Sequence, residues 1–359
     1  MEFNTDAIIS DANRLPWSRA PPFECGGASL VLLGVMSVLP HRVRFAQRMY
    51  AAQAVGCVRH VFVVGARFNA SEAGPAPLLV TDEDEVVTAS HMRRHSTINS
   101  RIGTWRKLAS FMRFAAAAPE PYVARADDDV FVSLPLLIQY AHRMSVLGLA
   151  RVYAGVFEWF NFRESSLEAV GFGYNYGTSV HTGKRHGCRA DAPPHECSGP
   201  YPFAKGPLLL MSAALVRDMV SSAPFRTYAA ASGGVVHDDV VLGVSVAKRP
   251  SVTYLRIRRN AWHDRTQRTY DSARLLAAHK IPWDCVARVA ATLPPSGAPR
   301  GAPRGAPGGP SRAAYSRHAC RPMRLPNLAN ASLCVLESRW NLTPTPVRCE
   351  GRFRPFHVA

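Results

Sequence analysis

Two acidic clusters, far apart in the sequence, contain the residues best suited to chemistry. One is the triplet at 127–129, which stands between two apolar stretches, and the other is the pair Asp238-Asp239, which precedes the apolar run 240–242. Adjacent carboxylates repel one another, so a hard divalent cation such as Mg²⁺ or Mn²⁺ is the natural group to neutralise the triplet. A cation held by one or two carboxylates typically bridges to substrate phosphates. The triplet therefore predicts a metal site, and the pair offers a second set of carboxylates.

Both clusters also have a purely structural interpretation. Asp is favoured in the first turn of a helix, and the segments that begin at Leu134 and Val240 both look helical. One Asp would suffice as a cap, so three in an apolar context favour the metal site. For Asp238 and Asp239, a capping role is compatible with catalysis.

The elements around the triplet predict an α/β fold. An apolar strand at 30–35, a basic helix and a second strand at 59–65 form a βαβ unit, which indicates a parallel sheet of the nucleotide-binding type. A helical pattern at 104–118 leads into the strand that ends at the triplet. Open α/β sheets bind ligands at the carboxyl ends of their strands, so this position suits a functional site. We also expect Gly34 and Gly65 to close their strands.

Charge and composition favour phosphate ligands over nucleic acid. The 359-residue chain is 47% hydrophobic, which is ample for a core, and its formal net charge is +17. The arginines are scattered, and no nucleic-acid-binding motif accompanies them, so we expect no nucleic-acid partner. The positive charge suits anionic phosphates instead.

The chain divides into four regions. Residues 1–24 are polar and predict a tail or stem, and residues 25–292 form the candidate catalytic domain. Residues 293–313 contain GAPRGAPRGAPGGP and predict a flexible linker, because this composition cannot form a core. Residues 314–359 contain three cysteines, and we expect them to pack back on the main body.

Cysteines and glycosylation sequons indicate an oxidising, secretory compartment. The chain has eight cysteines, and sequons begin at Asn69, Asn330 and Asn341. No transmembrane helix or signal peptide is visible in the sequence, so if the protein is a secretory enzyme, its membrane anchor lies outside this sequence.

The segment 171–205 lacks periodicity, and long irregular segments of this kind are more often functional than idle. Its histidines and cysteines match none of the usual zinc-site spacings. A disulfide between Cys188 and Cys197 fits better.

An ordered series of motifs resembles family 31 glycosyltransferases, the β-1,3-galactosyl- and N-acetylglucosaminyltransferase family. The most specific motif is ADDDVFV (126–132), at the triplet. The others are LVLLG (30–34), the arginine-rich helix, FVVG (62–65), TWRKL (104–108), YPFAKGPLLLMS (201–212) and DDVVLG (238–243). The likeness spans roughly Leu30 to Tyr270, and HTGKRHGC and AWHDRTQRTYD make the chain look like the trypanosomatid branch.

This resemblance implies a GT-A fold, in which one Rossmann-like nucleotide-binding domain is built on a mixed, mostly parallel central sheet. It implies a UDP-hexose donor, Mn²⁺ or Mg²⁺, a glycan acceptor in protein or GPI glycosylation, and inversion at the anomeric carbon. It also implies a type II membrane protein of the Golgi apparatus with a lumenal catalytic domain.

The resemblance also implies roles for individual residues. The metal ligands are Asp129, Asp127 and His263, although a surface or supporting histidine is the other interpretation of His263. The general base is Asp239, with Asp238 at the acidic position before it. The residues that bind the UDP-sugar are Arg44, Arg48, Lys107, Asp127, Asp128 and Lys205.

The chain departs from the family's pattern at two places. YPFAKG replaces the usual YPPYCSG, so Lys205 and Pro207 stand where small residues are usual, and donor and acceptor preference stay open. Lys205 is either solvated or bound to the donor pyrophosphate. Ala51 replaces a tryptophan.

Two other functions remain open. One is a catalytically inactive relative that binds UDP or carbohydrate. The other is a metal-dependent phosphohydrolase, which would usually need a second set of Asp and His ligands.

Overall fold

The computed structural model describes most of the region that carries the motifs. The longer described ranges are 27–53, 55–83, 98–146, 148–170, 198–232 and 237–257. The shorter ones are 193, 196, 262–263, 269–271, 276–279, 320–325, 328–336 and 346–348. Over these ranges, none of the helices is both long enough and apolar enough to span a membrane.

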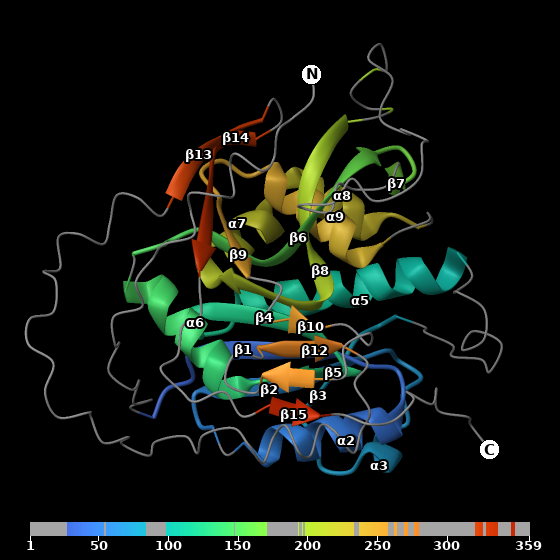
Figure 1. Ribbon diagram of the computed structural model, residues 1–359. Coiled ribbons are helices and arrows are strands. Elements are labelled where there is room, and N and C mark those ends of the chain that lie inside the picture. Colours follow the sequence, from blue (N-terminus) through green and yellow to red (C-terminus); the bar gives the residue numbers. More distant parts are fainter. Residues whose placement is uncertain are drawn as a thin grey trace, which may run out of the picture.

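A ten-stranded mixed sheet forms the centre of the molecule (Figure 1). In spatial order its strands are β13 (Cys320–Leu325), β14 (Leu328–Leu336), β9 (Thr253–Ile257), β6 (Val152–Arg163), β8 (Ser198–Ser212), β4 (Tyr122–Asp127), β1 (Val31–Met36), β2 (Val58–Val64) and β3 (Leu78–Val80). The strand β7 (Glu168–Val170) pairs with β6. Five of the pairings are parallel, and the antiparallel ones are β4–β8, β6–β8, β6–β7 and β13–β14. The predicted α/β class with a mixed, mostly parallel central sheet is therefore confirmed.

Helices cover both faces of the sheet, and each face has its own core. Successive strand side chains point to opposite faces, so Leu33 and Leu32 of β1 belong to different hydrophobic clusters. The first cluster includes side chains of α2 (Pro40–Ala51) and α6 (Leu134–Val146), and α3 (Ala70–Ala73) adds one residue. The second includes side chains of α5 (Ile98–Ala116), α7 (Ala213–Ser221), α8 (Ala223–Ala230) and α9 (Asp238–Ala247).

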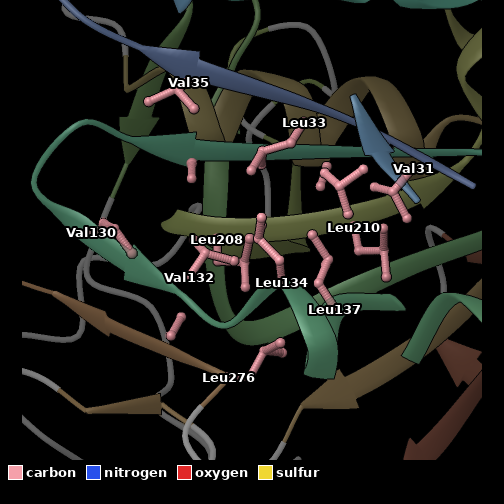
Figure 2. Close-up of a cluster of buried hydrophobic side chains, with 14 of the residues drawn as sticks. Val31, Leu33, Val35, Val130, Val132, Leu134, Leu137, Leu208, Leu210 and Leu276 are labelled. Atoms are coloured by element: carbon pink, nitrogen blue, oxygen red, sulfur yellow. The ribbon is translucent and has the colours of Figure 1, made fainter. Parts of the chain in front are cut away.

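A small three-stranded sheet packs on the first core beside the triplet. Its strands are β10 (Trp262–His263), β12 (Ala277–His279) and β5 (Val130–Val132). Figure 2 shows Leu276, directly before β12, near Val130 and Val132 of β5, with β1, α6 and β8 side chains around them. A separate pair joins β11 (Thr269–Asp271) to β15 (Pro346–Arg348).

The strands and helices that were predicted around the triplet form as expected, but one glycine was interpreted wrongly. Gly65 follows β2 directly, as expected, whereas Gly34 lies inside β1 and does not close it. A Cβ atom at Gly34 would stand 2.3 Å from the ring of Phe111 in α5. Glycine is therefore required there because the helix packs tightly on the strand.

Gly34→Ala should destabilise the protein by roughly 1–3 kcal/mol, because the added methyl group overlaps a buried ring. Gly103→Ala is the matched control: it lies in α5 with nothing within 4 Å of the new Cβ, so it should be neutral or stabilising. Urea unfolding measures both. In a Phe111→Leu background the cost of Gly34→Ala should shrink; an unchanged cost there would show that the ring is not its cause.

Candidate functional site

The acidic triplet begins at the carboxyl end of β4, where the chain leaves the sheet. Asp127 is the last residue of β4, and 32% of its side chain is exposed. Arg125, two residues earlier and therefore on the same face, has only 2% of its surface exposed. Its Nη2 atom lies 2.8 Å from Oδ1 of Asp127. The first carboxylate of the triplet is thus open to a ligand and already has one cationic neighbour.

Asp128 points into the protein instead. Its carboxylate accepts hydrogen bonds from Ser37 Oγ at 2.6 Å and from Arg42 Nη1 at 2.9 Å. Its backbone N–H donates to the carbonyl of Met36 at 3.1 Å. Asp128 therefore joins the end of β4 to the end of β1 and to α2.

Lys107 belongs to the same buried network. Its side chain is 1% exposed, and Nζ donates to the carbonyl of Ser37 at 3.0 Å. The structure thus places Lys107 and Asp128 beneath the carboxyl ends of β1 and β4. Contact of either with a UDP-sugar stays a prediction.

Asp129 lies beside a histidine that the sequence did not reveal. His279 of β12 has its Nε2 atom 3.5 Å from Oδ1 of Asp129, and its backbone pairs with Val130 of β5. His263 lies in the next strand, β10, with its backbone opposite Ala278. His279 stands in a strand of three residues, and the sequence pattern gives no sign that this strand pairs with the triplet.

The basic helix also presents a different arginine from the two that were predicted. Arg42 contacts Asp128, whereas Arg44 and Arg48 are exposed, and Arg44 donates to the backbone carbonyl of Glu72. Arg42 and Arg44 point to nearly opposite sides of the helix, because each helical residue turns about 100°. The structure does not bring Arg44 and Arg48 to the triplet.

The second acidic cluster forms the first turn of α9, which confirms a helical start there. Asp238 Oδ2 accepts a hydrogen bond from Arg125 Nη2 at 2.7 Å. Asp239 instead accepts from two backbone N–H groups, that of Val240 at 2.9 Å and that of Gly206 at 3.1 Å. Arg125 therefore joins the two acidic clusters, which are more than 100 residues apart in the sequence.

Gly206 lies in a bulge of β8. Gly155 and Phe157, two positions apart on β6, pair with Leu209 and Ala204, which are five positions apart on β8. The extra residues leave the regular ladder beside the end of β4, and bulges of this kind are common next to active sites. Lys205, in the bulge, forms an ion pair with Glu158 at 2.7 Å. The lysine predicted for the donor thus has a carboxylate partner within the protein.

The two acidic clusters hold carboxylates that are hard to ionise. Burial, and then the charge of Asp238, raises the pKa of Asp239 to about 7. Burial also raises the pKa of Asp127 to about 6, although Arg125 opposes the shift and 32% of the side chain is exposed. A group with a pKa near neutrality can both accept and release a proton at physiological pH.

The donor types at the triplet fit a divalent cation. Asp127 and Asp129 offer carboxylate oxygens and His279 an imidazole, which suits Mn²⁺ or Mg²⁺ when phosphates and water complete the shell. Within the described ranges, no three His, Cys, Asp or Glu side chains form a ready-made metal site by themselves. The proposed cysteine pair at 188 and 197 and the linker 293–313 lie outside those ranges.

Comparison with known proteins gives structural neighbours only. No protein-family model and no curated protein matches the chain. One similar solved structure is galactosyltransferase LgtC in complex with donor and acceptor sugar analogs, at 10% identity and a TM-score of 0.37, over 73% of this chain and 96% of that one. Another is the apo structure of the bifunctional glycosyltransferase WbbM, at 12% identity and a TM-score of 0.39, over 77% of this chain and 51% of that one.

Asp239→Asn should stabilise the metal-free protein increasingly as pH rises. The folded protein holds this proton up to about pH 7, whereas an unfolded Asp releases it near 3.8, so between these values wild-type stability falls with pH. The variant has no carboxyl group at this position, so its stability does not show this fall with pH. Its melting temperature should exceed that of the wild type by about 1 °C or more near pH 8 and by less near pH 5. Asp218→Asn, which removes a carboxylate at a distant ion pair, is the control, and the same trend there would remove the assignment to Asp239.

Proposed function

We propose that the protein is an inverting, metal-dependent glycosyltransferase of the GT-A type that transfers a hexose from a UDP-sugar to a glycan hydroxyl. The observation that carries the proposal is the meeting of two distant acidic clusters around Arg125, one with a partly exposed carboxylate at a strand end and one with a carboxylate whose pKa lies near 7. The motif series that resembles family 31 glycosyltransferases supports the same reaction.

On the donor side, Asp127, Asp129 and His279 are the residues that would hold the cation. When bound, Mn²⁺ or Mg²⁺ neutralises the negative charge that builds on the diphosphate of the departing UDP. The buried network of Asp128, Ser37 and Arg42 keeps the triplet in place, because it fixes the residue between the two cation ligands. His263 remains an alternative to His279 as the histidine ligand.

On the acceptor side, Asp239 is a better base than Asp238. Asp238 is held in a direct ion pair with Arg125, so its carboxylate already has a cationic partner. Among the described residues, the hydrogen-bond donors to Asp239 are two backbone N–H groups, and its pKa is about 7. In the proposed step the acceptor oxygen bonds to the anomeric carbon, the bond from that carbon to the diphosphate oxygen breaks, and the acceptor proton passes to Asp239.

The remaining parts of the proposal concern substrate and location. The donor hexose is galactose or N-acetylglucosamine, as in the family that the motifs resemble, or another hexose. The Lys205–Glu158 pair lies beside Gly206 in the chain, and either substrate could contact the partly exposed Lys205. Cys57 is disulfide-bonded, which supports a lumenal enzyme of the Golgi membrane, because disulfides persist in the secretory pathway.

UDP binding should require the cation. Asp129→Ala and His279→Ala should each lower Mn²⁺-dependent UDP affinity about 10-fold or more, because each removes a ligand, whereas His263→Ala should have a smaller effect. Isothermal titration of UDP with Mn²⁺ and with EDTA measures this. Equal binding in EDTA would contradict the metal-bridged site, and a larger effect of His263→Ala would reassign the histidine.

Asp239→Asn should reduce hexose transfer by roughly 10²–10⁴-fold and leave UDP affinity unchanged, because the amide cannot take the acceptor proton. Asp238→Asn should be milder. A radiolabelled or UDP-release assay with several UDP-sugars measures both variants. Near-wild-type transfer by Asp239→Asn would move the base elsewhere. UDP binding without transfer in the wild type would favour the inactive relative, and phosphate release would favour the phosphohydrolase.

A further inference from the structure

We propose that Arg125 is the positioning residue of the acceptor-side base. It would fix the carboxylate of Asp239 through Gly206 and oppose the cation at Asp127 through its charge. This role rests on the proposed function, since it presupposes a transfer reaction with Asp239 as base.

The guanidinium of Arg125 is surrounded by partners from three separate segments. Nη1 donates to the carbonyl of Gly206, and Nη2 contacts Asp238 at 2.7 Å and Asp127 at 2.8 Å. The side chain is 3% exposed, so these contacts are made out of bulk water, where electrostatic interactions are strong. A planar fork with several donors can serve all three partners at once, which a lysine ammonium cannot do in the same geometry.

Gly206 transmits the position of Arg125 to the base. Its carbonyl accepts from Arg125, and its own N–H donates to Asp239 Oδ2 at 3.1 Å. Gly206 lies in the β8 bulge, where the regular ladder of strand hydrogen bonds is interrupted. This segment is therefore held by fewer strand hydrogen bonds than its neighbours. The contact with Arg125 therefore holds the bulge in the position from which it orients Asp239.

The same guanidinium acts in the opposite direction on the cation side. Nη2 of Arg125 forms an ion pair with Oδ1 of Asp127. The positive charge of the guanidinium repels a divalent cation that approaches that carboxylate. Removal of Arg125 should therefore impair the base while leaving cation binding intact or strengthening it. A general loss of structure would weaken both, so the two readouts separate a positioning role from a purely structural one.

Arg125→Gln removes the charge and the fork, and Arg125→Lys keeps the charge alone. For Arg125→Gln we expect kcat to fall about 10- to 100-fold, as for a misplaced catalytic group, with the donor KM within about 3-fold of wild type. Its Mn²⁺ affinity, measured by titration without substrate, should equal or exceed that of wild type. Arg125→Lys should retain wild-type Mn²⁺ affinity with an intermediate kcat. Arg151→Lys, at the distant pair with Asp218, is the matched control and should leave kcat unchanged.

Gly206→Ala tests the same contact if Arg125→Gln fails to fold. Its Cβ would stand 2.6 Å from Arg125 Nη1, so the guanidinium must shift while its charge remains, and kcat should again fall about 10-fold. Normal kcat in a folded Arg125→Gln protein or in Gly206→Ala, or weakened Mn²⁺ binding by Arg125→Gln, would overturn the role while the wild type stays active. A wild type that transfers no hexose would reject the proposed function itself, and this role with it.

Discussion

A positive charge buried inside a central strand is the constraint on which the site depends. Transfer of a guanidinium from water into a protein interior costs several kcal/mol unless it is paired, so Arg125 must keep carboxylates close by. Asp127 satisfies it from its own strand and Asp238 from the start of α9. The carboxylates also depend on Arg125, since without its positive charge they would repel one another. The end of β4, the bulge of β8 and the first turn of α9 are thereby held together at one point.

A second buried network gives the middle residue of the triplet, Asp128, a structural role that differs from the roles proposed for its two neighbours. Lys107 and Arg42, from α5 and α2, reach Ser37 and Asp128 from opposite faces of the sheet. Both carboxylate oxygens of Asp128 accept these internal hydrogen bonds. Its neighbours in the triplet project differently and stay partly exposed. Adjacent identical residues can therefore have different tasks, because the backbone direction changes at each position.

The sequence predicted the parts of this site that depend on local pattern. Apolar runs placed β1, β2 and β4, and the acidic pair marked the start of α9. It failed where two distant segments meet: Gly34 was interpreted as a strand end because nothing in the sequence places Phe111 against it, and His279 carried no signal. Arg125, in contrast, carried a signal in the sequence. It is a lone charged residue in an apolar strand, and because it lies two residues before Asp127, the two side chains share one face of the sheet.

The C-terminal strands have a consequence for how the chain reaches this state. β14 pairs in parallel with β9, and the paired residues Ser332 and Thr253 are far apart in the sequence. During synthesis, one edge of β9 therefore stays unpaired until residues much later in the chain have been made. An unpaired strand edge can pair with other chains and so promotes aggregation. Parallel pairing over such separations is slow to form. This side of the sheet can therefore be completed only after residues 328–336 have been synthesised.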